Sequence, residues 1–128
     1  MKANKPGKLN RKNYAIIYSF ANVIMEIAGS LPKDESQRLR QLLRKPAHEI
    51  LNNRIDYEGQ YAEQTMRRYY IENMRSCAAV KAALDIALLK DYITRKLREE
   101  ILFYVKRVEN VSIEAMNRFY VKSDKETK

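Results

Sequence analysis

Apolar residues recur at helical spacing along four segments of the chain. In residues 13–28 the positions that share one face are Ile16, Phe20, Val23, Ile24 and Ile27. Recurrence at every third or fourth residue is typical of an amphipathic helix with one buried side. Residues 33–53 form a second segment of this kind, whose inward positions are expected to be Leu39, Leu42, Leu43, Ile50 and Leu51. The pattern therefore predicts two helices in this half of the chain.

Two longer helices are predicted in the second half. The third segment covers residues 61–92 and is apolar over much of its length. Thr94 directly precedes the fourth segment, and its hydroxyl suits an N-cap. The predicted inward face of the fourth helix is Leu97, Ile101, Tyr104, Val105, Val108, Ala115 and Phe119.

Few residues break these patterns, because the chain of 128 residues has only three glycines and three prolines. Gly29 and Pro32 lie between the first two segments, and Gly59 lies before the third. Pro46 falls inside the second segment, where it is expected to kink the helix or remove one backbone hydrogen bond. Four amphipathic helices with short connections predict an all-α, up-down antiparallel four-helix bundle. We expect a flexible basic arm at 1–12, the bundle at 13–121 and a tail at 122–128.

The third segment has more apolar surface than one copy of the bundle needs. Between Cys77 and Leu89 the only polar residues are Lys81 and Asp85, which are spaced to pair with each other. A helix that is apolar nearly all round is usually buried nearly all round. We therefore predict self-association through a second face, with Leu102, Phe103 and Ile113 of the fourth segment nearby. The predicted interface residues are Ala79, Ala82, Ala83, Ile86, Leu102, Phe103 and Ile113. The alternative is a centrally placed helix with scattered apolar residues on its surface.

The net charge of +9 favours a polyanionic partner, with nucleic acid first and an anionic membrane surface second. No acidic residue lies between Glu35 and Glu49, so the second segment has a basic ridge, and arginine donates two parallel hydrogen bonds to phosphate. The predicted nucleic-acid contacts are Arg11, Lys12, Arg38, Arg40, Arg44, Lys45, Arg67, Arg68, Lys96, Lys106 and Arg107. Such contacts recognise the phosphate backbone and carry no base sequence. Some of the nine tyrosines could stack on bases, although most tyrosines in bundles pack at the rim.

Residues for catalysis are sparse. One histidine and one cysteine do not make a metal site, and there is no glycine-rich phosphate loop, so we expect no cofactor and no enzyme activity. Cys77 is expected to be a small packing residue. In "RKPAH" three residues separate Arg44 from His48, whereas ribonucleases of the HEPN class have a longer spacing. A His48-dependent ribonuclease therefore stays a minor alternative. With no secretory signal and no long uncharged apolar run, we expect a cytoplasmic protein that does not span a membrane.

Several strings resemble a family of small bacterial four-helix bundle proteins. The family includes the accessory variability determinant of diversity-generating retroelements and the proteins encoded in 23S ribosomal RNA intervening sequences. The resemblance covers residues 18–120. It rests on "SLPKDESQRLRQLLRKPAHEILNN", "DYEG" and "SCAAVKAALDIALLKDYI". The matching positions are Arg44, Lys45, Ile50, Asn53, Leu84, Ile86, Ala87, Leu88 and Tyr92, whereas Pro46, His48 and Leu51 depart from the pattern.

The resemblance implies a homopentameric barrel with a basic surface. For the retroelement branch it also implies binding to a reverse transcriptase and to RNA or an RNA/DNA hybrid, in support of mutagenic cDNA synthesis. The leading hypothesis is therefore a non-catalytic nucleic-acid-binding accessory protein of a reverse transcriptase. The alternative is a structural or adaptor homo-oligomer of the intervening-sequence type that does not bind RNA.

Overall fold

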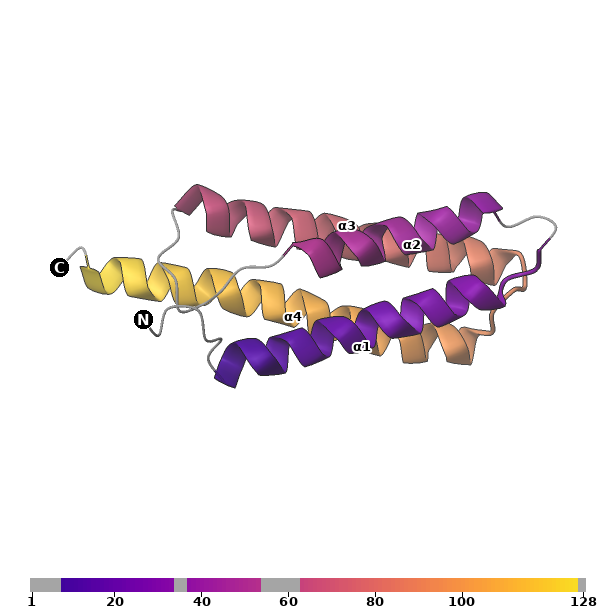
Figure 1. The fold of residues 1–128 in the computed structure, drawn as a ribbon, viewed down its shortest axis with the longest axis horizontal. Helices are drawn as coiled ribbons and strands as arrows, with labels where there is room; N and C mark the ends of the chain where they lie inside the picture. The colour runs from indigo at the N-terminus through magenta and orange to yellow at the C-terminus, as the bar shows by residue number, and fades with distance from the viewer. Residues whose placement is uncertain (1–7, 34–36, 54–62, 127–128) are drawn as a thin grey trace.

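The computed structural model describes the backbone of residues 8–33, 37–53 and 63–126, and the side chains of these residues except 8–11, 63 and 118–126. These residues form four α-helices and no strand: α1 (Lys8–Ser30), α2 (Gln37–Asn52), α3 (Glu63–Leu89) and α4 (Arg95–Glu126). The helices lie side by side along one long axis (Figure 1). The all-helical class and the four predicted helices are confirmed.

Each helix packs against its neighbours in sequence, and α4 also packs against α1, which closes the ring. Successive helices run in opposite directions, so the arrangement is an up-down antiparallel bundle (Figure 1). Two helices are longer than predicted: α1 begins at Lys8, within the expected arm, and α4 continues to Glu126, within the expected tail. The last turns of α4 extend beyond the start of α3 (Figure 1).

All four helices supply large side chains to the core. The most deeply buried include Phe20 and Ile24 of α1, Leu43 and Ile50 of α2, Val80 and Leu84 of α3, and Ile101 and Val105 of α4. Those of α1, α2 and α4 fall on the predicted inward faces, because burial of one stripe per helix is what stabilises a bundle.

Leu42 is a correction to the predicted inward face of α2. It is 43% exposed, whereas Leu39 and Leu43 on the same helix are buried. A step of one residue turns the chain by about 100° around the helix axis, which moves Leu42 from the core to the edge that faces α3. Leu42 thus becomes part of the outer surface.

The turn between α3 and α4 ends one helix and starts the next without glycine or proline. Tyr92 N donates to Ala87 O over 2.9 Å and Asp91 N donates to Leu88 O over 3.0 Å, the hydrogen bonds of a Schellman motif. Asp91 takes the left-handed conformation that this motif requires, with φ of 59°. Thr94 Oγ1 then accepts the backbone N–H of Leu97 over 3.1 Å, which confirms the predicted N-cap.

Pro46 does not end α2. The helix continues through it to Asn52, and the proline ring is buried in the bundle. Proline has no N–H, so the backbone hydrogen bond that position 46 would donate is missing, as predicted. Packing of the ring into the core compensates for part of this loss.

A polar layer crosses the core at the end of the bundle where α2 ends. Asn73 of α3 is fully buried; its Oδ1 accepts from Asn53 Nδ2 over 2.8 Å and its Nδ2 donates to Ser112 Oγ over 3.0 Å. The Ser112 hydroxyl donates in turn to Val108 O over 3.0 Å. The network ties α2, α3 and α4 together, because breaking any link would leave a buried polar group unpaired.

No helix in the described part of the chain combines the length and the apolar character needed to cross a membrane.

Candidate nucleic-acid and self-association surfaces

The exposed face of α2 holds three cations that form no ion pair with any described residue: Arg38, Arg44 and Lys45. Arg38 and Lys45 are exposed and Arg44 is half-buried. Arg38 and Lys45 lie seven residues apart, which is two helical turns and about 10 Å. Because no described acidic side chain pairs with them, we take their charges to be available to an anionic ligand. We call these three residues the α2 cations.

Arg40 is a correction to the predicted basic ridge. Its guanidinium turns toward α1, where Nε donates to Ala28 O over 3.0 Å and Nη2 donates to Leu31 O over 2.5 Å. The last carbonyls of a helix lack partners within the helix and carry partial negative charge, so a guanidinium stabilises them. Arg40 therefore holds the end of α1 against α2 and has little capacity left for phosphate.

The other predicted contacts lie on three different helices. Lys12 of α1, Arg67 and Arg68 of α3, and Lys96 and Lys106 of α4 are exposed. Arg107 of α4 is half-buried, with its guanidinium 5.6 Å from the centroid of the Phe103 ring. The side chain of Arg11 lies outside the described residues. These cations thus belong to helices other than α2.

The predicted pairing of Lys81 with Asp85 is wrong. Lys81 Nζ lies 2.7 Å from Glu109 Oε2, and Asp85 Oδ1 lies 2.7 Å from Arg98 of the same neighbouring helix, α4. Both residues pair with α4 because they lie at the boundary between α3 and α4, where oppositely charged side chains of α4 are within reach. Two ion pairs thus connect the two helices.

The outer face of α3 is apolar, as predicted, with one exception. Ala79 and Ala82 are exposed and Ile86 is 38% exposed, but Ala83 is only 1% exposed and belongs to the core of the single chain. Ala83 lies on the edge of α3 that faces α2, so α2 covers it. The surface strip that a partner could reach is therefore Ala79, Ala82 and Ile86.

Leu42 of α2 borders this strip. Ser76 Oγ donates to Glu49 Oε2 over 3.3 Å, which sets the register between the antiparallel helices α2 and α3. Two turns further along, the same register brings Leu42 opposite Ala83, on the edge of α3 beside the strip. We call Leu42, Ala79, Ala82 and Ile86 the outer strip; sequence analysis missed Leu42 because its own helix pattern placed it inward.

Other predicted interface residues lie on α4. Phe103 is 60% exposed and Ile113 is 38% exposed, whereas Leu102 is partly buried against the core. Leu89, at the end of α3, and Ile71 are also exposed, although the sequence did not single them out. Phe103 stands edge-on to Tyr104, with 5.6 Å between ring centroids. Exposed apolar side chains of this size, when they gather on one face, mark candidate interaction surfaces.

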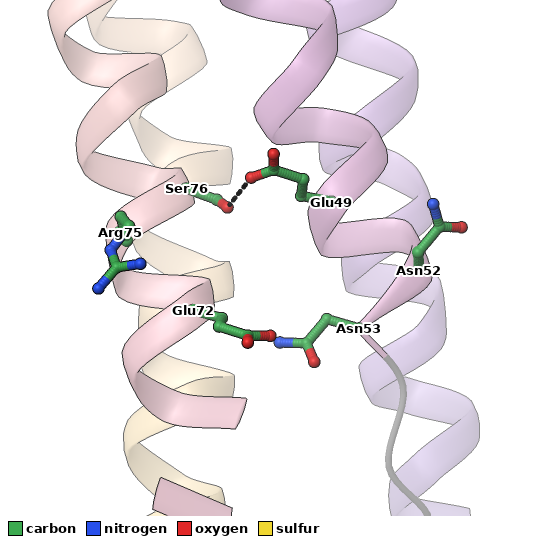
Figure 2. Close-up of a pocket in the computed structure, with 6 residues that line it drawn as sticks. All are labelled: Glu49, Asn52, Asn53, Glu72, Arg75 and Ser76. Carbon is green, nitrogen blue, oxygen red and sulfur yellow. Dashed lines mark hydrogen bonds between the residues drawn. The ribbon is translucent and has the colours of Figure 1, made fainter. Parts of the chain in front are cut away.

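A polar pocket of about 410 Å³ lies between the last turn of α2 and the middle of α3 (Figure 2). Its lining consists of Glu49, Asn52, Asn53, Glu72, Arg75 and Ser76. Glu49, Glu72 and Asn53 extend into the gap between the helices, whereas Arg75 points away from it (Figure 2). The pocket cannot be read from the sequence pattern, because its two sides are far apart along the chain and each has the pattern of an ordinary polar helix face.

The residues considered for catalysis stand apart from one another. Cys77 is fully buried, and burial, followed by the negative charge of Glu109, raises the pKa of its thiol from 9.0 to about 12. Such a thiol stays protonated and unreactive, in agreement with its predicted packing role. His48 is exposed on α2 and forms no hydrogen bond with the described residues. Among the same residues no group of acids, histidine and cysteine could hold a metal ion.

The tyrosines differ in their surroundings. Tyr18 of α1 is exposed and Tyr14 is half-buried, whereas Tyr69 is buried in a small cluster with Met66 and Ala115. Tyr57 and Tyr61 lie outside the described residues. Tyr18 is therefore more accessible to a base than Tyr14 or Tyr69.

Comparison of the chain with models of protein families, with curated proteins and with solved structures gives no match.

Proposed function

We propose that this chain is a non-catalytic nucleic-acid-binding protein that acts as a homo-oligomer. The observation that carries the proposal is the set of α2 cations, Arg38, Arg44 and Lys45, which lack acidic partners among the described residues. Cations that serve the fold are already engaged: Lys81 and Arg98 in ion pairs and Arg40 on backbone carbonyls. Cations that pair with no described acid, in a chain of net charge +9, favour binding to phosphates.

Self-association is supported by the apolar surface. The outer strip and Phe103 expose apolar side chains that a single copy leaves in water. Burying them against another copy would be favourable by about 25 cal/mol for each Å² of apolar area. Assembly would also bring the α2 cations of several copies together, and phosphate contacts on one nucleic acid would then reinforce one another.

The partner that we propose is a reverse transcriptase, with RNA or an RNA/DNA hybrid as the nucleic acid. This part rests on the resemblance of "SLPKDESQRLRQLLRKPAHEILNN" and "SCAAVKAALDIALLKDYI" to the retroelement accessory proteins, which also implies a pentamer. The role would be to hold template RNA near the polymerase. A reverse transcriptase that is retained on the immobilised protein after nuclease treatment would support it, and failure to retain the enzyme would count against it.

The test of nucleic-acid binding is the affinity for a labelled single-stranded RNA at salt concentrations between about 50 and 200 mM. The variant Arg38→Gln, Arg44→Gln, Lys45→Gln should bind more weakly, and the slope of log affinity against log salt should fall by about 2, because each phosphate contact on a single strand contributes about 0.7. Arg40 stays unchanged in this variant so that the fold is preserved.

A matched control separates position from total charge. Lys33→Gln, Arg75→Gln, Arg95→Gln removes the same number of positive charges from other exposed positions. It should lose much less affinity than the α2 variant. Equal losses in the two variants would show that binding follows net charge alone and would exclude α2 as the contact.

A structural adaptor without RNA binding is the second candidate, and the exposed outer strip favours it. It predicts an oligomer that RNA and heparin do not retain at physiological salt. The His48 ribonuclease has less support, because no described side chain orients His48. Cleavage of RNA by the intact protein that is lost in His48→Ala would revive it.

A further inference from the structure

The polar pocket between α2 and α3 concentrates negative charge on a strongly basic chain. Glu49 and Glu72 both extend into it, and neither forms an ion pair with a described residue (Figure 2). The last turn of α2, which ends beside the pocket, contains no basic residue, so no side chain of that turn offsets the negative end of the helix dipole. The pocket therefore favours a cation.

The two carboxylates differ in how far they are engaged. Glu49 Oε2 already accepts a hydrogen bond from the buried Ser76 hydroxyl over 3.3 Å, which holds it at the pocket wall. No hydrogen bond or ion pair to Glu72 exists among the described residues. Among the described residues no group of three or more acids, histidine and cysteine could hold a metal ion, whereas two carboxylates suit a planar guanidinium that donates several hydrogen bonds at once.

The outer strip lies on the same face, further along α3. Ala79 is seven residues from Glu72, which is about 10 Å along the helix. A ligand that fills both features must present an apolar group and a cation about this far apart. The outer face of α4 carries both groups: Phe103 is exposed, and Arg107 follows one turn later, about 6 Å along the helix. The Arg107 guanidinium lies 5.6 Å from the centroid of the Phe103 ring, so it has to swing away from the ring to span the remainder, a rotamer change of the kind that is common at interfaces.

Building on the proposed self-association, we propose that two different faces of the chain dock together. The Glu49–Glu72 pocket of one copy receives the Arg107 guanidinium of a second copy, while Phe103 of the second copy covers the outer strip of the first. The charges are complementary, which offsets the repulsion between copies of net charge +9. Because the two faces differ, the contact is head to tail, and it closes into a ring when the rotation between copies allows it.

Charge reversal tests this contact. Sedimentation velocity of the full chain should show that Glu72→Arg and Arg107→Glu each raise the dissociation constant of the assembly by at least about tenfold, since like charges then meet in the pocket. The double variant, and an equimolar mixture of the two single variants, should regain the assembly, because opposite charges meet again. Glu26→Arg and Lys12→Glu, which change the net charge by the same amounts on exposed positions of α1, should leave the assembly intact.

The outcomes separate this contact from the wider proposal. Two results would overturn the docking while self-association stands. In the first, the wild-type chain is an oligomer and Glu72→Arg and Arg107→Glu leave its mass unchanged. In the second, the single variants dissociate and the double variant does not regain the assembly. A wild-type chain that sediments as a single copy would overturn self-association, and the docking with it. RNA affinity is measured separately and bears on neither result.

Discussion

At the scale of single residues, charge alone does not tell which cations serve the fold. Arg38 and Arg40 are two residues apart on α2, yet Arg38 faces water and Arg40 binds the last carbonyls of α1. The difference follows from the turn of the helix, which points Arg40 at the end of α1. Substitutions at these two positions should therefore have different consequences.

Arg40→Ala should lower the free energy of unfolding by about 2 kcal/mol, because hydrogen bonds from a charged donor to two helix-end carbonyls are lost. Arg38→Ala, at an exposed position of the same helix, should change it by less than about 0.5 kcal/mol. Urea unfolding followed by circular dichroism measures both. Equal effects at the two positions would contradict the assignment of Arg40 to the fold.

The buried thiol of Cys77 makes a prediction about pH. Its pKa is about 12 in the folded chain and 9.0 where it is not buried. Between these values the folded state keeps the proton and the unfolded state loses it, so the thiol lowers stability as pH rises, by about 1.4 kcal/mol for each pH unit. Below pH 9 this contribution is constant.

The comparison with Cys77→Ala isolates that contribution, since tyrosines and lysines titrate in the same range in both proteins. The substitution creates a small cavity and lowers stability at neutral pH. Above pH 9, however, the stability of the variant should fall less steeply with pH than that of the wild type. Parallel pH profiles for the two proteins would show that the Cys77 thiol is not shielded.

At the scale of the helices, the two ion pairs between α3 and α4 have different surroundings. The Glu109 side chain is only 11% exposed, whereas that of Asp85 is 60% exposed. A buried carboxylate that loses its cationic partner destabilises the fold, because water cannot solvate its charge. A carboxylate at the surface is solvated by water when its partner is removed. The inner pair should therefore matter more for stability.

Lys81→Ala should destabilise the bundle by about 2 kcal/mol, because Glu109 is left with its charge largely buried. Arg98→Ala should cost less than about 1 kcal/mol, as is usual for an exposed pair. The double variant Lys81→Ala, Glu109→Ala should recover part of the first loss. Thermal or urea unfolding of the three variants gives the order, and an effect of Arg98→Ala larger than that of Lys81→Ala would contradict it.

The helices and their inward sides could largely be predicted from the sequence. The residues that pair with each other between helices could not. Periodicity identifies the inward side of one helix, and a hydroxyl such as that of Thr94 marks its start, since both are local properties. Which residue of another helix meets Lys81 or Arg40 depends on the rotation and register of two helices, which local patterns do not encode. For the same reason two residues lie on the opposite side from the one predicted. Ala83 was expected on the outer face and is buried, whereas Leu42 was expected in the core and is exposed.

The pocket is a further case of this limit. Its residues come from the end of α2 and the middle of α3, and only the antiparallel register brings Glu49 and Glu72 to the same gap. Each carboxylate taken alone is an ordinary solvated side chain. A sequence pattern could have indicated the site only through the absence of basic residues at the end of α2, which is a weak signal.

At the scale of the whole molecule, one copy of the bundle leaves apolar surface uncovered. The outer strip and Phe103 would be buried if copies associate, and the α2 cations would then form a shared surface for nucleic acid. Ile86→Lys places a charge in the middle of the outer strip and should weaken association. Asn22→Lys adds the same charge at an exposed position of α1 and should not.

Sedimentation equilibrium of the wild-type chain over a wide range of concentrations tests the central claim most directly. We expect a mass that is a multiple of the mass of one chain and that falls toward it only on strong dilution, with Ile86→Lys dissociating at higher concentration than Asn22→Lys. A wild-type mass equal to that of one chain at every concentration would contradict the account.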